Sequence, residues 1–155
     1  MLLVDDNPIN LGLLVTYAKK RNIPYITAVD GQQAVEAYQN AYRRSRGRRP
    51  SIPFSQPTTP LTASVPESNT AMLTVPEIIL MEINMPAMDG YEATRRIRAY
   101  EEKHRLQSAK IVALTALGSI EAADAAFGSG VDDVLTKPVQ FRNLTTVLQK
   151  LLERD

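Results

Sequence analysis

The chain has 155 residues, of which 44% are hydrophobic and 23% are charged, and it contains no cysteine. This composition predicts one globular domain, residues 1–155, with a sizeable core, and it excludes disulfides and thiolate metal sites. The 18 Lys and Arg residues nearly balance the 17 Asp and Glu residues, so the net charge of +1 offers no electrostatic case for nucleic acid or an anionic membrane. We find neither a secretory signal nor a membrane-spanning apolar run, and we expect a cytoplasmic protein.

Short apolar runs alternate with amphipathic stretches along the chain. The runs predict strands at Leu2–Val4, Tyr25–Ala28, Ile78–Met81, Ile111–Leu114 and Val134–Thr136. The stretches predict helices at about 8–21, from Asp30-Gly31 through Tyr38, and at about 91–103, 119–127 and 141–152, with Gly128 or Gly130 as the stop of the fourth. This alternation is typical of right-handed βαβ units, and it predicts an α/β fold with a doubly wound parallel sheet between two layers of helices.

Residues from about 44 to 76 break this rhythm. Prolines are interspersed there with Ser, Thr, Gln and Arg, and no hydrophobic periodicity is present. Such a segment buries too little apolar surface to offset its ordering entropy, so we predict a disordered insertion within the single domain. The basic run before Ser51, and Thr59 before a proline, suggest a phosphorylation-regulated docking loop, although a solvated tether is the simpler interpretation.

Polar residues end or directly follow four of the predicted strands. In chain order they are Asp5 and Asp6, Glu82, Thr115 and Lys137. In open α/β sheets, ligands bind outside the carboxyl ends of the strands, so we expect these side chains to converge on one pocket. Three carboxylates, a hydroxyl and an ammonium suit a divalent cation together with a phosphoryl group.

Magnesium is the cation that these residues favour. The carboxylates of Asp5, Asp6 and Glu82 and the backbone carbonyl of Asn84 would offer it a few hard oxygen ligands, with water or phosphate oxygens completing an octahedron. Without a cation the carboxylates would raise one another's proton affinity, and Lys137 is the obvious internal counter-charge.

These motifs, in this order, resemble the receiver domains of two-component response regulators, the CheY-like superfamily. The resemblance is strongest to receivers of fungal-type hybrid histidine kinases, and it rests on Asp5-Asp6 with the following Asn7-Pro8-Ile9-Asn10, on Met85-Pro86-Ala87-Met88-Asp89-Gly90, on Thr115-Ala116 and on Lys137-Pro138. It implies a flavodoxin-like (βα)5 sandwich with strand order 2-1-3-4-5. It also implies a phosphorelay function, with a histidine kinase or a histidine phosphotransfer protein as the phosphodonor.

The resemblance also implies roles for single residues. An Asp at the position of Glu82 would accept the phosphoryl group, and Thr115 and Lys137 would contact its oxygens. Mg²⁺ would be bound directly by Asp6 and the carboxylate at 82, with Asp5 acting through water. Relatives carry a switching aromatic residue at the position of Val134, which has no ring, so we expect Val134 to pack as an ordinary strand residue.

Glu82 departs from the family pattern, and its extra methylene moves the carboxylate roughly one bond length toward Thr115 and Lys137. Glu82 therefore either partly mimics a phosphorylated Asp, is itself a working acceptor despite the displaced geometry, or is an introduced change. The favoured interpretation is a receiver that cannot be phosphorylated.

Two other functions remain open at this stage. The first is a protein-binding module that acts without phosphorylation. The second is a phosphohydrolase of the haloacid dehalogenase type, which is disfavoured because its Asp-x-Asp-x-Thr motif is not matched by the residues from Asp5 to Ile9. The sequence does not predict the oligomeric state, and it places the single histidine, His104, at a polar helix end where we expect it to be solvated.

Overall fold

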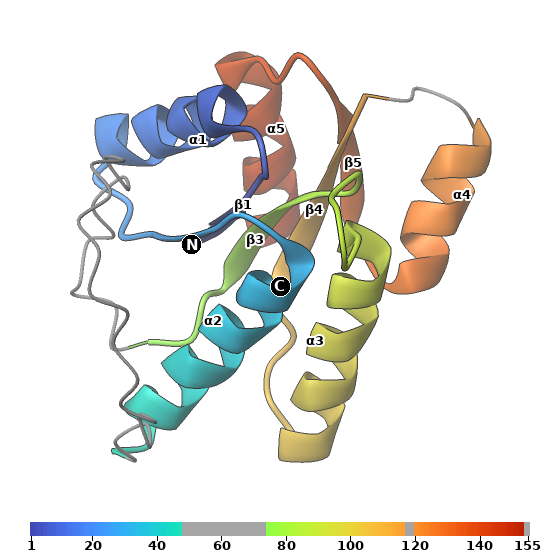
Figure 1. Cartoon of the computed structure of the whole chain (residues 1–155). Coiled ribbons are helices and arrows are strands. Elements are labelled where there is room, and N and C mark those ends of the chain that lie inside the picture. Colours follow the sequence, from blue (N-terminus) through green and yellow to red (C-terminus); the bar gives the residue numbers. More distant parts are fainter. Residues whose placement is uncertain (48–73, 117–119, 154–155) are drawn as a thin grey trace, which may run out of the picture.

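The computed structural model describes residues 1–47, 74–116 and 120–153, in which five strands and five helices alternate (Figure 1). In chain order they are β1 (Leu2–Val4), α1 (Pro8–Lys20), β2 (Ile26–Ala28), α2 (Gly31–Ser45), β3 (Ile78–Glu82), α3 (Gly90–His104), β4 (Lys110–Thr115), α4 (Ile120–Ser129), β5 (Asp133–Thr136) and α5 (Phe141–Leu152). The alternation predicted from the hydrophobic pattern is confirmed.

The strands form one parallel sheet in the order β2-β1-β3-β4-β5. This is the flavodoxin-like, doubly wound order that the resemblance implied. Leu80 of β3 lies opposite Leu3 of β1 on one side and Val112 of β4 on the other. Because all neighbours are parallel, the carboxyl ends of the strands meet at a single edge of the sheet.

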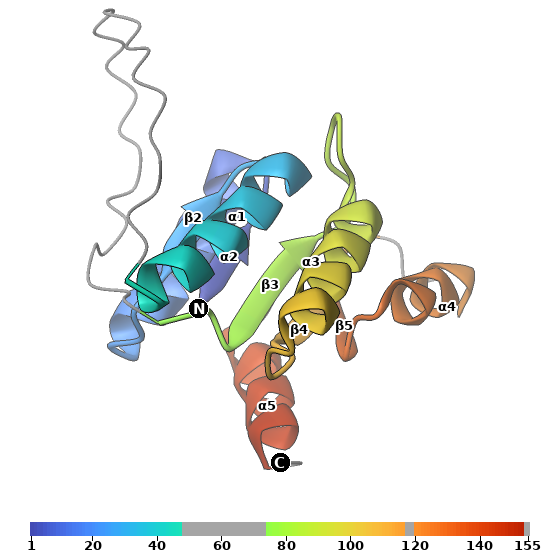
Figure 2. The same ribbon diagram turned by 90° about the horizontal axis from the view of Figure 1, so that it is seen from below.

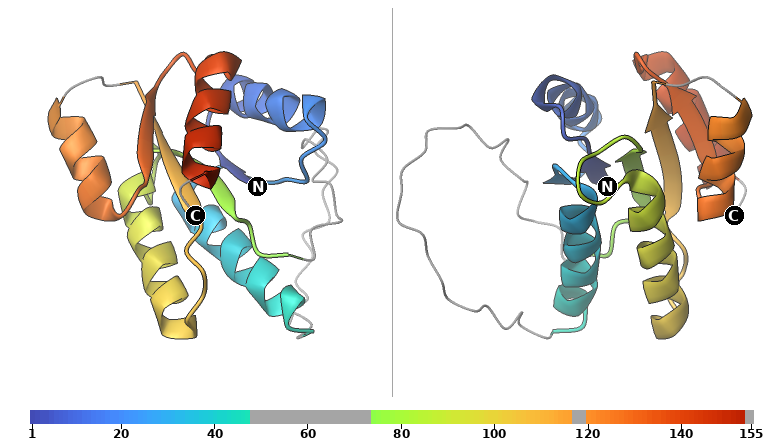
Figure 3. Two further views of the ribbon diagram at one scale, coloured as in Figure 1. Left: turned by 180° about the vertical axis from the view of Figure 1, so that it is seen from behind. Right: turned by 45° about the vertical axis from the view of Figure 1, so that its right-hand side comes forward.

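Helices cover both faces of the sheet, with α1 and α5 on one face and α2, α3 and α4 on the other (Figures 1 and 3). Figure 2 shows the same layers from below. Alternate strand residues enter two separate buried clusters, so that Leu3 packs with α1 and α5, whereas Leu2 and Val4 pack with α2 and α3. Burial on both faces explains why the strands are unbroken apolar runs in the sequence.

The amino terminus of α1 is capped as the sequence predicts. The Asn7 side-chain oxygen accepts hydrogen bonds from the backbone N–H groups of Ile9, at 2.9 Å, and Asn10, at 3.3 Å. Pro8 occupies the first helical position, where the missing N–H group has no helical partner to lose. This cap fixes the point at which the chain turns away from the end of β1.

Two helices extend beyond their predicted ends. Helix α2 continues past Tyr38 to Ser45 because Ala41 is still buried, so the first residues of the predicted insertion are helical. Helix α4 passes through Gly128 and stops before Gly130, whose φ of +102° only glycine adopts readily. Residues 48–73 of the insertion, including Ser51 and Thr59, lie outside the described residues. Within residues 1–47, 74–116 and 120–153, no helix is long and apolar enough to cross a membrane.

Candidate phosphoacceptor site

Three strand ends bring charged side chains together at the carboxyl edge of the sheet. Asp5 directly follows β1, Glu82 ends β3 and Lys137 directly follows β5. The Lys137 ammonium donates a 2.6 Å hydrogen bond to Asp5 Oδ2 and also pairs with Glu82 Oε2. Asp5 is 1% exposed and Glu82 is 4% exposed. One ammonium group thus bridges two buried carboxylates.

The second oxygen of each carboxylate is held by the backbone. Asn7 N–H donates to Asp5 Oδ1 at 2.9 Å, and Asn84 N–H donates to Glu82 Oε1 at 2.8 Å. In both cases the donor lies two residues beyond the acid, which is the geometry of an Asx-type turn. The two carboxylates are therefore fixed in matching orientations, with one oxygen toward the backbone and the other toward Lys137.

The pKa of Lys137 reflects this arrangement. Burial is the largest single influence and would lower the pKa of the ammonium group, but the hydrogen bonds and charges of Asp5 and Glu82 outweigh it. Their combined effect raises the pKa of Lys137 above its usual 10.5. Lys137 is therefore charged throughout the physiological pH range and neutralises part of the acidic cluster.

Thr115 also lies at this edge of the sheet. It is the last residue of β4, is 4% exposed, and its carbonyl oxygen accepts a 2.8 Å hydrogen bond from the backbone N–H of Lys137. Thr115 lies opposite Thr136 in the register of β4 and β5. The backbone thus brings the predicted hydroxyl residue next to the predicted ammonium residue, although the two are 22 positions apart in the sequence.

The loop from Met85 to Gly90 folds back over the end of β3. Gly90 N–H donates a 2.9 Å hydrogen bond to the Ile83 carbonyl, and a Cβ atom at Gly90 would lie 2.3 Å from the Glu82 carbonyl oxygen. Only glycine fits this close approach. Asp89 then caps α3 by accepting a 2.8 Å hydrogen bond from Glu92 N–H. The Asp-Gly pair therefore serves to return the chain tightly over the acceptor position.

The predicted magnesium ligands are only partly gathered in this structure. Asp6 and Asn84 are exposed at the rim of the site. Within the described part of the chain, no three His, Cys, Asp or Glu residues lie close enough together to hold a metal ion, so Asp5, Asp6 and Glu82 do not form such a group. Their oxygens have the hard-donor chemistry that Mg²⁺ prefers, and the complete ligand set stays a prediction.

Val134 packs as expected from its small aliphatic side chain. It lies opposite Ala113 in the sheet, is half-buried, and packs against the core beneath α2 and α3. Nothing at this position supplies an aromatic ring that could move in response to Thr115.

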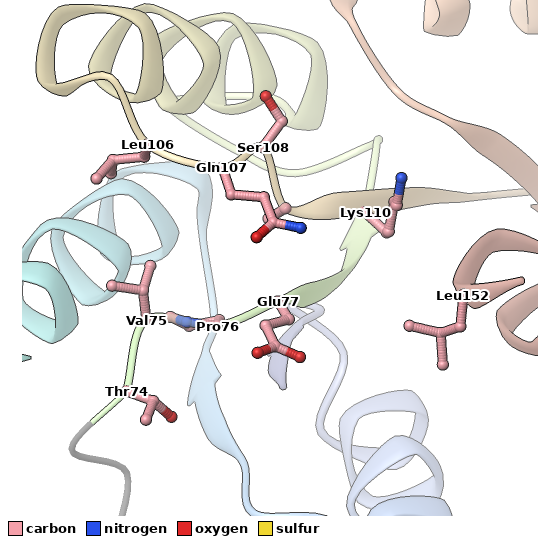
Figure 4. A pocket seen from close by; sticks show the side chains of 10 residues that line it. Thr74, Val75, Pro76, Glu77, Leu106, Gln107, Ser108, Lys110 and Leu152 are labelled. Carbon is pink, nitrogen blue, oxygen red and sulfur yellow. The ribbon is translucent and has the colours of Figure 1, made fainter. Parts of the chain in front are cut away.

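Another cavity, of about 290 Å³, lies at the opposite ends of the strands (Figure 4). It is lined by residues that precede or begin β3 and β4, among them Glu77 and Lys110, and by Leu152 of α5. None of the residues predicted for the phosphoryl site lines it. A cavity of only about 50 Å³ adjoins Asp5 and Lys137. The size of a cavity therefore does not identify the phosphoryl site.

An apolar surface beside the site was missed from the sequence. Ile9 is 81% exposed and Leu13 is 42% exposed, both on α1. Leu13 also lines the small cavity together with Lys137 and Pro138. The sequence pattern could have indicated this surface, because Ile9 and Leu13 fall outside the stripe of α1 that Leu11, Leu14, Val15 and Ala18 bury.

A parallel doubly wound sheet, with buried acids, a threonine and a lysine at its carboxyl edge, defines the receiver class of signalling domains. Residues 64–149 match the response regulator receiver domain family. The chain belongs to this family.

Relatives extend the match to nearly the whole chain. The sensor protein GacS of Pseudomonas syringae is 31% identical over 150 residues, which cover 97% of this chain and 13% of GacS. The peroxide stress-activated histidine kinase mak1 of Schizosaccharomyces pombe is 27% identical over 98% of this chain and 7% of mak1. The chain therefore spans only a small fraction of the length of these kinases.

Solved structures agree with this assignment. The receiver domain of a sensor histidine kinase of Pseudomonas aeruginosa, crystallised with magnesium in its active-site cleft, has a TM-score of 0.63 and 28% identity, covering 96% of this chain and 93% of that one. A co-crystal structure from Saccharomyces cerevisiae, of the histidine phosphotransfer protein Ypd1 with the receiver domain of Ssk1, gives a TM-score of 0.68 and 28% identity, covering 93% and 81%.

Proposed function

We propose that this chain acts as a receiver of a hybrid-kinase phosphorelay in which Glu82 occupies the acceptor position, takes up no phosphoryl group and partly mimics the phosphorylated state. The observation that carries the proposal is the Lys137 ammonium bridging Glu82 and Asp5. In a phosphorylated receiver, the same lysine would be needed by a phosphate oxygen. Glu82 engages it without any phosphoryl group.

The mimicry is partial because the charges differ. A Glu side chain carries one negative charge, whereas a protein-bound phosphoryl group carries about −1.5 to −2 at pH 7. The hydrogen bond from Asn84 N–H and the pairing with Lys137 occupy both oxygens of Glu82. An oxygen held in this way, and displaced by one methylene, is poorly placed for in-line attack, where a misplacement of ~1 Å can cost ~10²-fold in rate.

Magnesium belongs to this proposal through the donor chemistry of the site and through the relative crystallised with it. Asp5, Asp6 and Glu82, together with the Asn84 carbonyl, would hold the cation, which when bound would neutralise charge around the acceptor. Lys137 already pairs with two of these carboxylates. We therefore expect Mg²⁺ to bind only when Lys137 gives up some of its contacts with Asp5 and Glu82.

The partner of this domain would be a histidine kinase or a histidine phosphotransfer protein. The yeast complex supports this choice, and so does the apolar surface of Ile9 and Leu13 on α1. Exposed apolar residues next to a reacting site are typical of a docking surface. Docking there would place a partner's histidine close to the carboxyl edge of the sheet.

Mimic binding tests the acceptor proposal. Mg²⁺ with beryllofluoride, a stable phosphoryl mimic, is titrated into this chain, into Glu82→Asp and into Glu82→Gln, and binding is followed by calorimetry. We expect strong mimic binding only by Glu82→Asp, because that variant alone restores the shorter carboxylate. Equal binding by the unchanged chain, or an acyl phosphate at Glu82 after incubation with a phosphorylated phosphotransfer protein, would refute the proposal.

Docking is tested separately from acceptor chemistry. In the Glu82→Asp background, the double change Ile9→Ala with Leu13→Ala should weaken binding of a phosphotransfer protein at least tenfold, and Phe127→Ala should not. Phe127 is a matched control because it is 50% exposed but lies on α4. Equal weakening by both variants, or by neither, would contradict docking on α1.

A further inference from the structure

A second cluster of functional groups lies at the carboxyl ends of α2 and α3, away from the carboxyl end of β3 (Figure 1). A hollow of about 460 Å³ opens there, and its lining consists of aromatic and basic residues: Tyr42, Arg43, Arg46, Tyr100, Lys103 and His104. We call these six residues the basic-aromatic groove. No carboxylate is among the lining residues described.

The floor of the groove is an organised set of rings. The centroid of Tyr42 lies 5.7 Å from that of Tyr100 and 5.1 Å from that of His104, and Tyr100 and His104 are 4.3 Å apart. His104 is half-buried, so it is only partly solvated, less than its position at a polar helix end predicts. The reason is tertiary, because α2 supplies the tyrosine that covers it. Burial also raises the pKa of Tyr100 above its usual 10.0.

The cations at the rim have no acid to neutralise them in the described part of the chain. Arg43 donates to the Asn40 side chain at 3.1 Å, and Arg46 donates to the Tyr42 hydroxyl at 3.3 Å, and both acceptors are uncharged. By contrast, Arg95 and Arg96, on another part of α3, both pair with Glu92.

The helix dipole accounts for only part of this arrangement. Cations are favoured in the last turn of a helix, where Arg43 and Lys103 lie. That preference does not explain why the last turns of two helices enclose a hollow lined by mutually packed aromatic rings. Guanidinium groups present paired donors that match phosphate and carboxylate oxygens, and clusters of them recognise phosphorylated and acidic motifs.

We propose that the basic-aromatic groove binds a phosphorylated side chain on an acidic segment of a partner protein. Complementary charge is the reason for choosing this occupant. The open, polar lining differs from the mostly apolar pockets that enclose small molecules, which disfavours a free metabolite. The groove would give the domain a second docking point, independent of the chemistry at Glu82.

Peptide binding tests this proposal. A fluorescent Glu-rich peptide with a central phosphoserine, and the same peptide unphosphorylated, are titrated into the full chain. We expect the phosphopeptide to bind at least tenfold more tightly than the unphosphorylated peptide. The double change Arg43→Ala with Arg46→Ala should weaken phosphopeptide binding at least tenfold. The matched control is Arg95→Ala with Arg96→Ala, which changes the net charge equally and should leave affinity within about twofold.

A second measurement does not depend on any variant. In the unchanged chain, the phosphopeptide should shift the NMR resonances of Tyr42, Tyr100 and His104 and leave those of Glu82 and Lys137 unchanged. Equal affinity for both peptides, equal loss in both double variants, or shifts spread over the whole surface would each overturn the proposal. Failure here leaves the proposed role of Glu82 intact, because mimic binding tests that role separately.

Discussion

Two partly buried ion clusters in this domain have the same charges but differ in how their cation is held. At the carboxyl edge of the sheet, Lys137 lies between Asp5 and Glu82. On α3, the Arg98 guanidinium lies between Glu101 of the same helix, at 2.7 Å, and Asp132, at 2.9 Å. Each cluster therefore places one cation between two carboxylates, so charge count alone does not distinguish them.

The difference lies in how many groups hold the cation. Arg98 also donates to the carbonyl oxygens of Gly130, at 2.9 Å, and Ala109, at 2.8 Å. Its acids are held as well, with further hydrogen bonds to Glu101 from Tyr38 OH and Ala109 N–H and to Asp132 from Ile111 N–H. Arg98 thus ties α3 to β4 and to the turn before β5.

Lys137 has a simpler set of side-chain contacts. Its ammonium group is a point charge on a flexible stem that contacts one oxygen from each acid. The rim beside it is open, since Asp6 and Asn84 are exposed. A planar guanidinium held by acids and backbone carbonyls therefore suits a structural cluster, whereas an ammonium that can change partners suits a cluster that must admit a cation or a phosphoryl group.

The largest expected effect comes from breaking the arginine cluster. Arg98→Met leaves Glu101 buried without its counter-charge, and we expect the free energy of unfolding to fall by about 3–5 kcal/mol. Urea unfolding measures this loss, and added Mg²⁺ should not restore it. Arg95→Met is the control, because its exposed pair with Glu92 is expected to contribute under about 1 kcal/mol. A loss at Arg98 no larger than at Arg95 would contradict a structural role.

The lysine cluster should respond less strongly and in a different way. Lys137→Met removes the shared partner of Asp5 and Glu82, and we expect a loss of about 1–3 kcal/mol, because Lys137 makes fewer contacts than Arg98. Magnesium should recover part of this loss, since a cation bound only by the folded state stabilises it. Thermal unfolding with and without Mg²⁺ measures both effects.

A matched lysine separates this effect from a general loss of charge. Lys150 pairs with Asp133 at 3.6 Å and is 53% exposed, so Lys150→Met should change stability little, with or without Mg²⁺. If Mg²⁺ stabilises both lysine variants equally, the cation does not act at the Asp5 and Glu82 cluster.

The sequence predicted the lysine cluster because its members mark the ends of apolar strands. Asp5, Glu82 and Lys137 each end or follow a strand, and strand ends of a parallel sheet meet at one edge. The same hydrophobic pattern predicted α5 at its observed bounds, 141–152, whereas the strand order was implied only by the family resemblance. What the pattern could not give is the bridging position of the ammonium, which depends on side-chain geometry.

The arginine cluster could not be predicted in this way. Arg98 and Glu101 lie on an otherwise polar helix, where the surface pairs of Glu92 look the same in sequence. Their burial arises because Tyr38 from α2 and Asp132 before β5 close over them, and both contacts join residues more than 30 positions apart. The basic-aromatic groove was missed for a similar reason, since its rings come from two different helices.

The smallest expected effect separates the two clusters by pH. Burial, followed by the charge and hydrogen bond of Glu101, raises the pKa of Tyr38 above its usual 10.0. Above pH 10 the unfolded chain releases this proton before the folded protein does, so stability falls as pH rises. Tyr38→Phe should therefore cost about 1 kcal/mol at pH 8, for the lost hydrogen bond, and progressively less as the pH rises above 10.

Unfolding free energies of the unchanged chain and of Tyr38→Phe, measured in parallel from about pH 8 to pH 11, give this difference directly. Subtracting one curve from the other cancels the titration of Lys137, which both proteins share. A difference that stays constant across the range would show that folding does not raise the pKa of Tyr38, neither by burial nor by the charge of Glu101. Tyr38 would then not distinguish the arginine cluster from the lysine cluster by pH, and the contrast between them would rest on the contacts of the guanidinium.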